Sequence, residues 1–225
     1  MTVIPQLTQP SLAIAGTEQR FPVRRIYCVG QNYADHAREM GSDPTRQEPF
    51  FFSKPADAVV ASGTALAFPS RTGDLHHEVE LVVALAQGGR DVEVAAASDL
   101  IFGYGVGIDL TRRDLQAQAK KAGRPWDMAK GFDHSAPIGP LTRGMPPSRG
   151  SIALAVDGEQ RQVGDLEQMI WNVAEIIATL STYVELAGGD LIFTGTPAGV
   201  GPVTGGQTLR ATIQGAEPLE VSFRA

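Results

Sequence analysis

Two acidic residues, spaced two apart in a strand-like segment, are the first feature of this sequence that could do chemistry. The segment reads LHHEVELVVALA over residues 75–86, and the strand period of two places Glu78 and Glu80 on one face. Adjacent carboxylates repel each other unless positive charge lies between them, and a hard divalent cation would supply that charge. An edge strand with two solvated acids would give the same spacing.

A third carboxylate, Asp109, ends the apolar and glycine-rich segment IFGYGVGID. A carboxylate is costly to bury there unless it is paired or bound to metal. A cap on the following helix would also explain it. Three carboxylates on strands would form an all-oxygen site, which suits Mg²⁺ or Mn²⁺ better than zinc. Octahedral coordination would leave positions open for water and substrate oxygens.

The segment after Asp109 predicts a helix over residues 111–122, opened by a capping-box pair, Thr111 and Asp114. Three polar residues recur at helical spacing and point the same way: Arg113, Gln116 and Lys120. The functional interpretation places Arg113 and Gln116 near the metal and the substrate. A solvated helix face is the alternative.

Lys130 lies in the segment PWDMAKGFDHSAPIGP, residues 125–140, between small and aromatic neighbours. A lysine there could balance excess carboxylate charge and donate to a substrate oxygen. A lysine on a surface loop is an equally good explanation. Asp133 and His134 are weaker candidates, because a turn or cap accounts for them as well.

His36 and Glu39 are three residues apart on a helix predicted over residues 32–41, with Asn32 as its cap and Gly41 as its stop. They share a face of that helix. A carboxylate behind a histidine orients the ring and raises its basicity, so the pair could activate water. An exposed pair on an amphipathic helix remains open.

The segment FTGTPAGVGP, residues 193–202, is rich in glycine, but it lacks the lysine of a P-loop and the spacing of a dinucleotide-binding loop. It is either a generic turn or a backbone cradle for a substrate carboxylate, with the Thr196 hydroxyl assisting.

Strand-like segments outnumber helical ones and do not alternate with them, although residues 167–187 carry a long helical pattern. We therefore expect a β-rich α+β fold with a mixed sheet and a few short helices. The division expected is an extended N-terminal arm over residues 1–20 and one catalytic domain over residues 21–225.

Composition narrows the function classes further. The net charge is −6 and the pI about 5.2, which argues against a nucleic-acid partner. No apolar run reaches the ~20 residues of a membrane helix, and the first residues do not form a secretory signal. A cytoplasmic location is therefore expected. The single cysteine, Cys28, allows no internal disulfide and is expected to be a buried core residue.

Taken in order, these motifs resemble the short, single-domain members of the fumarylacetoacetate hydrolase family. The segments that carry the resemblance are GQNYADHAREMG, FFFSKPADAVV, HHEVELVVAL, GYGVGIDLTRRDLQ, GRPWDMAKGFDHSAPIGP and DLIFTGTPAGVGPV. It runs from about Phe21 to near the C-terminus. It implies a mixed β-roll or sandwich fold, usually a homodimer.

The resemblance also implies roles for individual residues. Mg²⁺ or Mn²⁺ would be held by Glu78, Glu80 and Asp109. His36 and Glu39 would form a water-activating dyad on a lid helix. Lys130 and Gln116 would contact substrate oxygens with Arg113 nearby, and Thr196 would bind the substrate carboxylate.

Within the family, the segments around residues 21–41 and 49–60 look most like fumarylpyruvate hydrolases of aromatic (gentisate-type) catabolism. The expected reaction is cleavage of a carbon–carbon bond in a 2,4-dioxo acid, giving fumarate and pyruvate. Oxaloacetate decarboxylation and isomerisation of 2-hydroxyhepta-2,4-diene-1,7-dioate are alternatives on the same metal site. A non-catalytic metal-binding homologue is the remaining one. Fumarylpyruvate would also need a cation for its far carboxylate, and Arg25, Arg46 and Arg124 are candidates.

Overall fold

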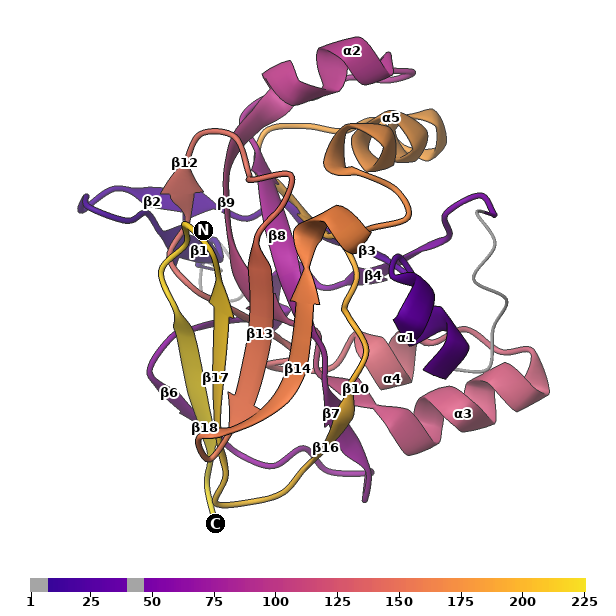
Figure 1. The fold of residues 1–225 in the computed structure, drawn as a ribbon, viewed down its shortest axis with the longest axis vertical. Helices are drawn as coiled ribbons and strands as arrows, with labels where there is room; N and C mark the ends of the chain where they lie inside the picture. The colour runs from indigo at the N-terminus through magenta and orange to yellow at the C-terminus, as the bar shows by residue number, and fades with distance from the viewer. Residues whose placement is uncertain (1–7, 40–46) are drawn as a thin grey trace, which may run out of the picture.

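An eight-stranded mixed sheet forms the centre of the fold in the computed structural model, which describes residues 8–39 and 47–225 (Figure 1). In order across the sheet its strands are β4 (Phe51–Lys54), β3 (Arg25–Val29), β15 (Asp190–Phe193), β8 (Val79–Leu85), β9 (Ile101–Ile108), β11 (Ala136–Ile138) and β5 (Val59–Ala61), with β12 (Thr142–Arg143) paired to β9. The pairs β15–β3 and β11–β5 are parallel and the others antiparallel. The predicted β-rich α+β class with a mixed sheet is confirmed.

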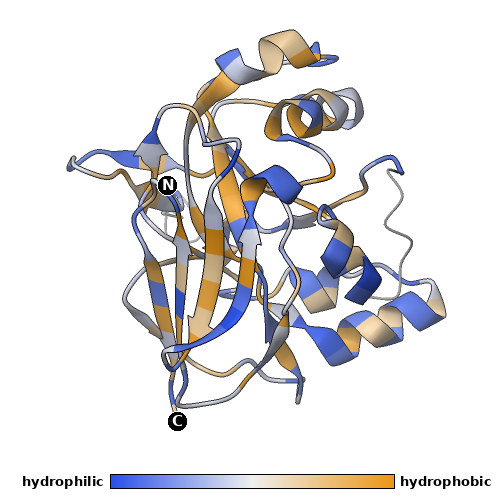
Figure 2. Cartoon of the chain, viewed as in Figure 1, coloured by the Kyte–Doolittle hydropathy of each residue, from blue (hydrophilic) through white to orange (hydrophobic). Residues whose placement is uncertain are grey.

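A five-stranded sheet packs over one face of this centre. Its order is β14 (Glu159–Asp165), β13 (Ser151–Val156), β17 (Thr208–Ile213), β18 (Leu219–Phe223) and β6 (Thr64–Leu66). Buried and exposed residues alternate along β13, β17 and β18, and Figure 2 shows the matching alternation of hydropathy. This alternation is typical of a sheet with one face on the core and one in water.

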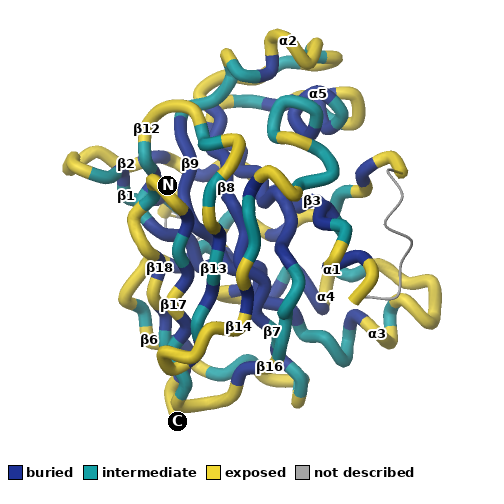
Figure 3. Tube along the Cα trace, viewed as in Figure 1, coloured by how far each residue is buried: buried dark blue, intermediate teal, exposed yellow. Residues whose placement is uncertain are grey.

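The central strands are buried on both faces, as Figure 3 shows for β8 and β9. Leu81 and Val83 face the core shared with the five-stranded sheet, whereas Val82 and Ala84 belong to a second cluster on the opposite face. A hairpin of β1 (Ser11–Ala13) and β2 (Arg20–Pro22) packs against that second cluster. Cys28 lies in it too, fully buried as predicted.

Residues 75–86 form two strands, not the single strand that their sequence predicts. β7 (Leu75–His77) belongs to a three-stranded sheet with β10 (Thr111–Arg112) and β16 (Gly201–Val203), and β8 belongs to the central sheet. Glu78 stands between them. Its carbonyl accepts from the Asp109 N–H (2.8 Å), so the two chain segments are tied together where they cross between sheets.

Three helices gather near β10 in Figure 1: α1 (Ala34–Glu39), α3 (Arg113–Ala122) and α4 (Asp127–Lys130). Two more, α2 (Val94–Ala97) and α5 (Val173–Tyr183), cover the opposite end, and the 3₁₀ turns are η1 (Ala56–Ala58), η2 (Ser98–Leu100) and η3 (Leu166–Gln168). α5 starts later than the pattern over residues 167–187 predicts, because Asn172 and Glu175 form its capping box. No helix in the described ranges is long and apolar enough to cross a bilayer.

Asn32 does not cap α1, and that prediction is wrong. Its side chain donates to the carbonyls of Trp171 (2.9 Å) and Thr194 (2.7 Å) and accepts from the Trp171 N–H (2.8 Å). The residue therefore connects the start of α1 to two distant segments, which a local spacing rule cannot predict. The proposed stop at Gly41 lies outside the described residues.

Gly107 gives a direct test of how tightly the central sheet is packed. A methyl group at this position would lie 2.4 Å from Val82 Cγ2 and 2.6 Å from Phe193 Cε1. Gly107→Ala should lower the free energy of unfolding by about 1–3 kcal/mol, as overpacking does, measured by urea denaturation. Gly73→Ala is the control, because no atom lies within 4 Å of the added methyl group. Equal stabilities for the two variants would contradict the packing described.

Candidate metal centre and active-site pocket

Three buried carboxylates converge at the crossing between β7, β8 and β9. One ligand atom from each of Glu78, Glu80 and Asp109 lies within 4.8 Å of the others. The antiparallel register pairs Val79 with Ile108, which brings the residues flanking that pair together. The three predicted carboxylates are therefore adjacent in space. The solvated alternative for Glu78 and Glu80 does not hold, because both are buried, and Asp109 does not cap α3, which no side chain caps.

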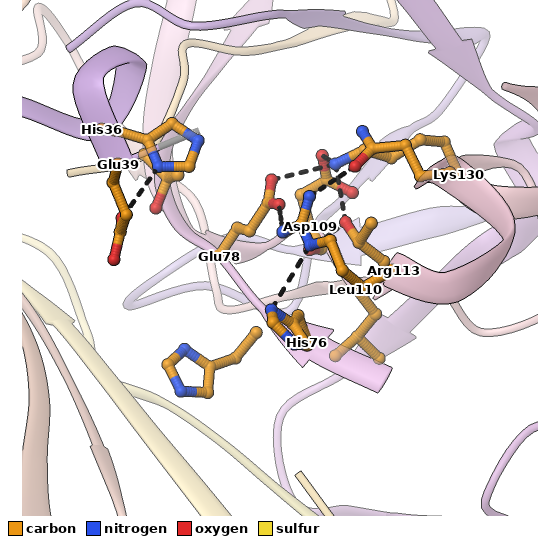
Figure 4. A network of polar contacts seen from close by, with 12 residues as sticks. His36, Glu39, His76, Glu78, Asp109, Leu110, Arg113 and Lys130 are labelled. Carbon is orange, nitrogen blue, oxygen red and sulfur yellow. Dashed lines mark hydrogen bonds and ion pairs between the residues drawn. The ribbon is translucent and has the colours of Figure 1, made fainter. Parts of the chain in front are cut away.

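Cations surround two of these carboxylates, as Figure 4 shows for Glu78 and Asp109. The Lys130 ammonium lies 2.9 Å from Glu78 Oε2, 2.6 Å from Asp109 Oδ2 and 2.6 Å from the Thr111 hydroxyl. The Arg113 guanidinium pairs with the other oxygen of Glu78. Lys130 is thus part of the charge balance of the site and not an exposed loop lysine.

Lys54 is a site residue that the sequence analysis missed. Its ammonium is completely buried, lies 2.8 Å from Asp109 Oδ1 and donates to the carbonyls of Leu110 (3.2 Å) and Lys130. A lysine that directly follows the apolar run FFFS was an available signal, because such a lysine is rarely buried without a partner. The partner itself, 55 residues away along the chain, is not visible in a local pattern.

Glu80 lacks the compensation that its neighbours receive. Its Oε2 accepts from the Gly195 N–H (2.6 Å), and no described cation lies within ion-pair distance of it. Burial, and then the charges of Asp109 and Glu78, raise the pKa of the Glu80 carboxyl well above its usual range. Burial also opposes ionisation of Glu78, but Lys130 and Arg113 lower the pKa of that carboxyl below its usual range.

This donor set fits a divalent cation. Three carboxylates supply the oxygen ligands that Mg²⁺ and Mn²⁺ prefer, and the site carries one acid with no cation of its own. Asp109 Oδ1 is buried and accepts no hydrogen bond, since its contact with Lys54 is an ion pair without hydrogen-bond geometry. A bound ion would compensate these oxygens.

His36 lines the same pocket from α1, and Glu39 lies beside its ring. His36 is buried, and its Nδ1 lies 3.3 Å from Glu39 Oε2 (Figure 4). Glu39 also accepts from the Gly199 N–H at 3.2 Å, which ties the end of α1 to the glycine-rich loop. If Nδ1 carries the proton donated to Glu39, the lone pair of Nε2 is left to act as a base.

The predicted polar residues of α3 and Thr196 of the glycine-rich loop line this pocket as well. The lining residues are Val29, Gly30, Gln31, His36, Phe50, Phe52, Glu78, Glu80, Arg113, Gln116, Lys120, Trp126, Lys130, Gly195 and Thr196. Arg113 donates to Gln116 Oε1 (2.5 Å), so the amide nitrogen of Gln116 remains available as a donor.

The predicted capping box at the start of α3 is wrong, because Arg112 precedes the helix and no side chain caps it.

Gln162 is a second residue that the sequence analysis missed. This fully buried side chain accepts from the Val79 N–H (3.0 Å), lies 2.9 Å from His77 Nδ1 and donates to the Thr196 hydroxyl (2.8 Å). Burial lowers the pKa of His77, which favours a neutral ring that donates through Nδ1. Because the Thr196 oxygen already accepts a hydrogen bond, its proton is free to point toward an anion in the pocket.

Comparison with known proteins places this geometry in a family. The model of the fumarylacetoacetate (FAA) hydrolase C-terminal domain matches residues 25–224. The chain belongs to the fumarylacetoacetate hydrolase family. The resemblance inferred from its motifs, and the fold it implied, are therefore confirmed.

Three relatives show which activities occur among proteins similar to this chain. The crystal structure of fumarylpyruvate hydrolase from Pseudomonas aeruginosa, in complex with Mn²⁺ and pyruvate, is 51% identical, with a TM-score of 0.97 over 100% of this chain and 99% of that one. A fumarylpyruvate hydrolase of a Ralstonia species is 41% identical, covering 80% of this chain and 95% of its own. An oxaloacetate tautomerase of Escherichia coli is 42% identical, covering 87% and 90%.

Neutralising Glu80 should stabilise the metal-free protein and remove its response to metal. A carboxyl whose pKa is raised by folding costs stability when ionised, and that cost grows as the pH rises above its ordinary value toward the raised one. Glu80→Gln keeps an acceptor for the Gly195 N–H but carries no charge. After chelator treatment at pH 7, circular dichroism should give it a higher melting midpoint than the wild type.

Added Mn²⁺ should raise the midpoint of the wild type and leave that of Glu80→Gln nearly unchanged, because ligand binding stabilises only a protein that binds. Glu93→Gln, on an exposed residue before α2, is the matched control and should respond to Mn²⁺ as the wild type does. A metal-free Glu80→Gln that melts below the wild type would show that the ionised carboxylate is compensated in some other way.

Proposed function

We propose that this protein hydrolyses an acylpyruvate, with fumarylpyruvate and water as substrates and fumarate and pyruvate as products. One observation carries the proposal: His36, whose ring lies beside Glu39, lines one pocket together with Glu78 and Glu80 of the buried carboxylate triad. The 51% identity to a fumarylpyruvate hydrolase over the whole chain supports the same substrate. A water-activating base beside a metal site is what this hydrolysis needs.

Glu78, Glu80 and Asp109 would hold Mg²⁺ or Mn²⁺. The cation would supply Lewis acidity at the oxygens of the 2-oxo acid end and so stabilise the enolate that leaves. At the same end, Thr196 would donate its hydroxyl proton to the substrate carboxylate, in the orientation that Gln162 imposes. Lys54 and Lys130 would hold the triad in place by neutralising Asp109.

His36 would then remove a proton from water through Nε2, while Glu39 holds the ring and stabilises the imidazolium. The hydroxide attacks the C4 carbonyl of the substrate, which lies beyond the 2-oxo acid end. Lys130 and the amide nitrogen of Gln116 would donate to the oxyanion that forms, where fixed donors are most effective. The carbon–carbon bond breaks, its electron pair passes to the pyruvate enolate, and the enolate takes up a proton to give pyruvate.

The pKa values are consistent with Lys130 as a charged donor. Burial lowers the pKa of its ammonium, but Asp109 and Glu78 more than offset this and raise it above its usual value. Lys130 therefore stays protonated at neutral pH.

The homodimer and the cytoplasmic location remain predictions.

Oxaloacetate chemistry is the second candidate, because the oxaloacetate tautomerase of Escherichia coli is 42% identical to this chain. Oxaloacetate is also a 2-oxo acid. Its decarboxylation yields the same pyruvate enolate without attack by water. A decarboxylase would therefore depend on the carboxylate triad and less on His36.

His36→Asn should separate the two activities. We expect it to lower kcat for fumarylpyruvate by about 10²–10⁴-fold, the usual contribution of a general base, and to change CO₂ release from oxaloacetate far less. The measurement is loss of the enol absorbance of fumarylpyruvate, with one pyruvate formed per fumarate, in chelator-treated protein with and without added Mn²⁺.

The matched control is His134→Asn, at an exposed turn residue with φ of 62°, a conformation that asparagine tolerates. It should leave both activities unchanged. Slow fumarylpyruvate loss beside fast, Mn²⁺-dependent CO₂ release from oxaloacetate in the wild type would move the assignment to the decarboxylase. No turnover of either substrate would contradict both.

Gln162 should act on substrate binding through Thr196. Gln162→Glu keeps an acceptor for the Val79 N–H but removes the donor to Thr196, so the threonine proton would turn away from the pocket. We expect KM for fumarylpyruvate to rise about tenfold, the loss of one hydrogen bond to a charged group. In a Thr196→Val background the same substitution should have little further effect. Additive effects would mean that Gln162 acts by another route.

A further inference from the structure

Beyond the triad, the pocket presents one cation that the chemistry proposed above does not use. Lys120 lines the pocket from α3, is exposed, and forms no ion pair with any residue that the structure describes. The other cations of the lining, Arg113 and Lys130, are both paired with Glu78. Lys120 is thus the lining lysine that no carboxylate of the described residues neutralises.

The arginines predicted for the far carboxylate fit this role less well. Arg25 donates to the Tyr27 hydroxyl (3.0 Å) and does not line the pocket. Arg124 lines a neighbouring surface hollow with Pro125 but not the pocket itself. Arg46 lies outside the described residues.

The position of Lys120 along α3 matches the length of an extended substrate. Arg113, Gln116 and Lys120 follow one another on a single face, and α3 leads outward from β10 (Figure 1). Lys120 is seven positions after Arg113 on the helix, which is about 10 Å along the axis. Arg113 therefore contacts the metal-site carboxylates while Lys120 stands at the outer part of the pocket.

Aromatic side chains line the pocket as well. Phe50 and Trp126 meet edge to face with ring centroids 5.5 Å apart, and Phe52 lies 6.0 Å from Trp126. These rings offer apolar surface to a flat, conjugated chain and no charged group to its middle. A substrate that is charged at both ends and apolar between them is complementary to this lining.

We infer that Lys120 binds the far carboxylate of the substrate and so makes the pocket selective for acylpyruvates that are diacids. This inference rests on the proposed function for the placement of the 2-oxo acid end. It assigns selectivity to the outer end of α3 and leaves the bond-breaking chemistry at the inner end. Oxaloacetate, whose chain is three carbons shorter than that of fumarylpyruvate, would not reach Lys120.

The test compares two substrates, one with a charged far end and one with a neutral far end, in binding and in turnover. Isothermal titration calorimetry would measure Kd for fumarylpyruvate and for methyl-ended acetylpyruvate, in Mn²⁺-loaded His36→Asn protein, so that binding is read without hydrolysis. Adding Lys120→Met should raise the Kd for fumarylpyruvate about tenfold, as expected for a partly solvated charge pair. Acetylpyruvate should bind as before. In otherwise wild-type protein, KM should change in the same way.

Lys121→Met is the matched control. Lys121 also lies in the last turn of α3 and carries the same charge, but it does not line the pocket. A loss caused by helix stability or by net charge would appear in both variants, since cations near a helix C-terminus stabilise it alike. Arg124→Met tests the rival site in the neighbouring hollow.

Selective loss of fumarylpyruvate affinity in Lys120→Met, with both controls unchanged, supports the inference. Equal effects on the two ligands, or a loss that appears only in Arg124→Met, would overturn it while the hydrolase assignment stands. If the wild type binds both ligands but hydrolyses neither, the proposed function fails and the calorimetric comparison still decides the role of Lys120. No binding of fumarylpyruvate by the His36→Asn protein would overturn the inference directly.

Discussion

The mutual repulsion of three buried carboxylates is the constraint on which the rest of the site depends. Lys130, Lys54 and Arg113 relieve it at Glu78 and Asp109, and each of these cations comes from a different element of the fold. Glu80 is left with one backbone hydrogen bond. Such incomplete compensation would be destabilising in a purely structural cluster. In a metal centre it leaves the Glu80 carboxyl, which has no ion pair, for the ion to compensate.

Hydrogen bonds from neighbouring side chains orient two polar groups of the pocket lining, the Thr196 hydroxyl and the Gln116 amide. Gln162 donates to the Thr196 oxygen, and Arg113 donates to Gln116 Oε1. In both pairs the acceptor atom is occupied, so the group that remains for the pocket is a donor. An anionic substrate needs donors, and fixed donors do not have to reorganise as charge develops. The donors that the pocket presents are therefore fixed by neighbouring side chains, by Gln162 for Thr196 and by Arg113 for Gln116.

The sequence predicted the fold class, and the structure brings most of the predicted site residues together around one pocket, while their roles stay predictions. The spacing of Glu78 and Glu80 in a strand-like segment was informative because strand alternation is a local property. Lys54 and Gln162 were missed because their partners are distant in sequence and no local period connects them. The break at Glu78 was missed for a related reason: β7 and β8 read as one strand, and only their pairing with different partners separates them.

Glu78 stands where the chain leaves one sheet for another, and its carbonyl is hydrogen-bonded to the residue after β9, Asp109. This bond fixes the register of the two segments that carry the carboxylate triad at their shared end. Inserting or deleting one residue between 75 and 80 would turn a ligand to the opposite face. The other end of the β8–β9 hairpin, which carries α2, holds no residue of the carboxylate triad. A change in chain length at α2 would disturb its packing on α5, whereas one at the crossing would also move a carboxylate of the triad.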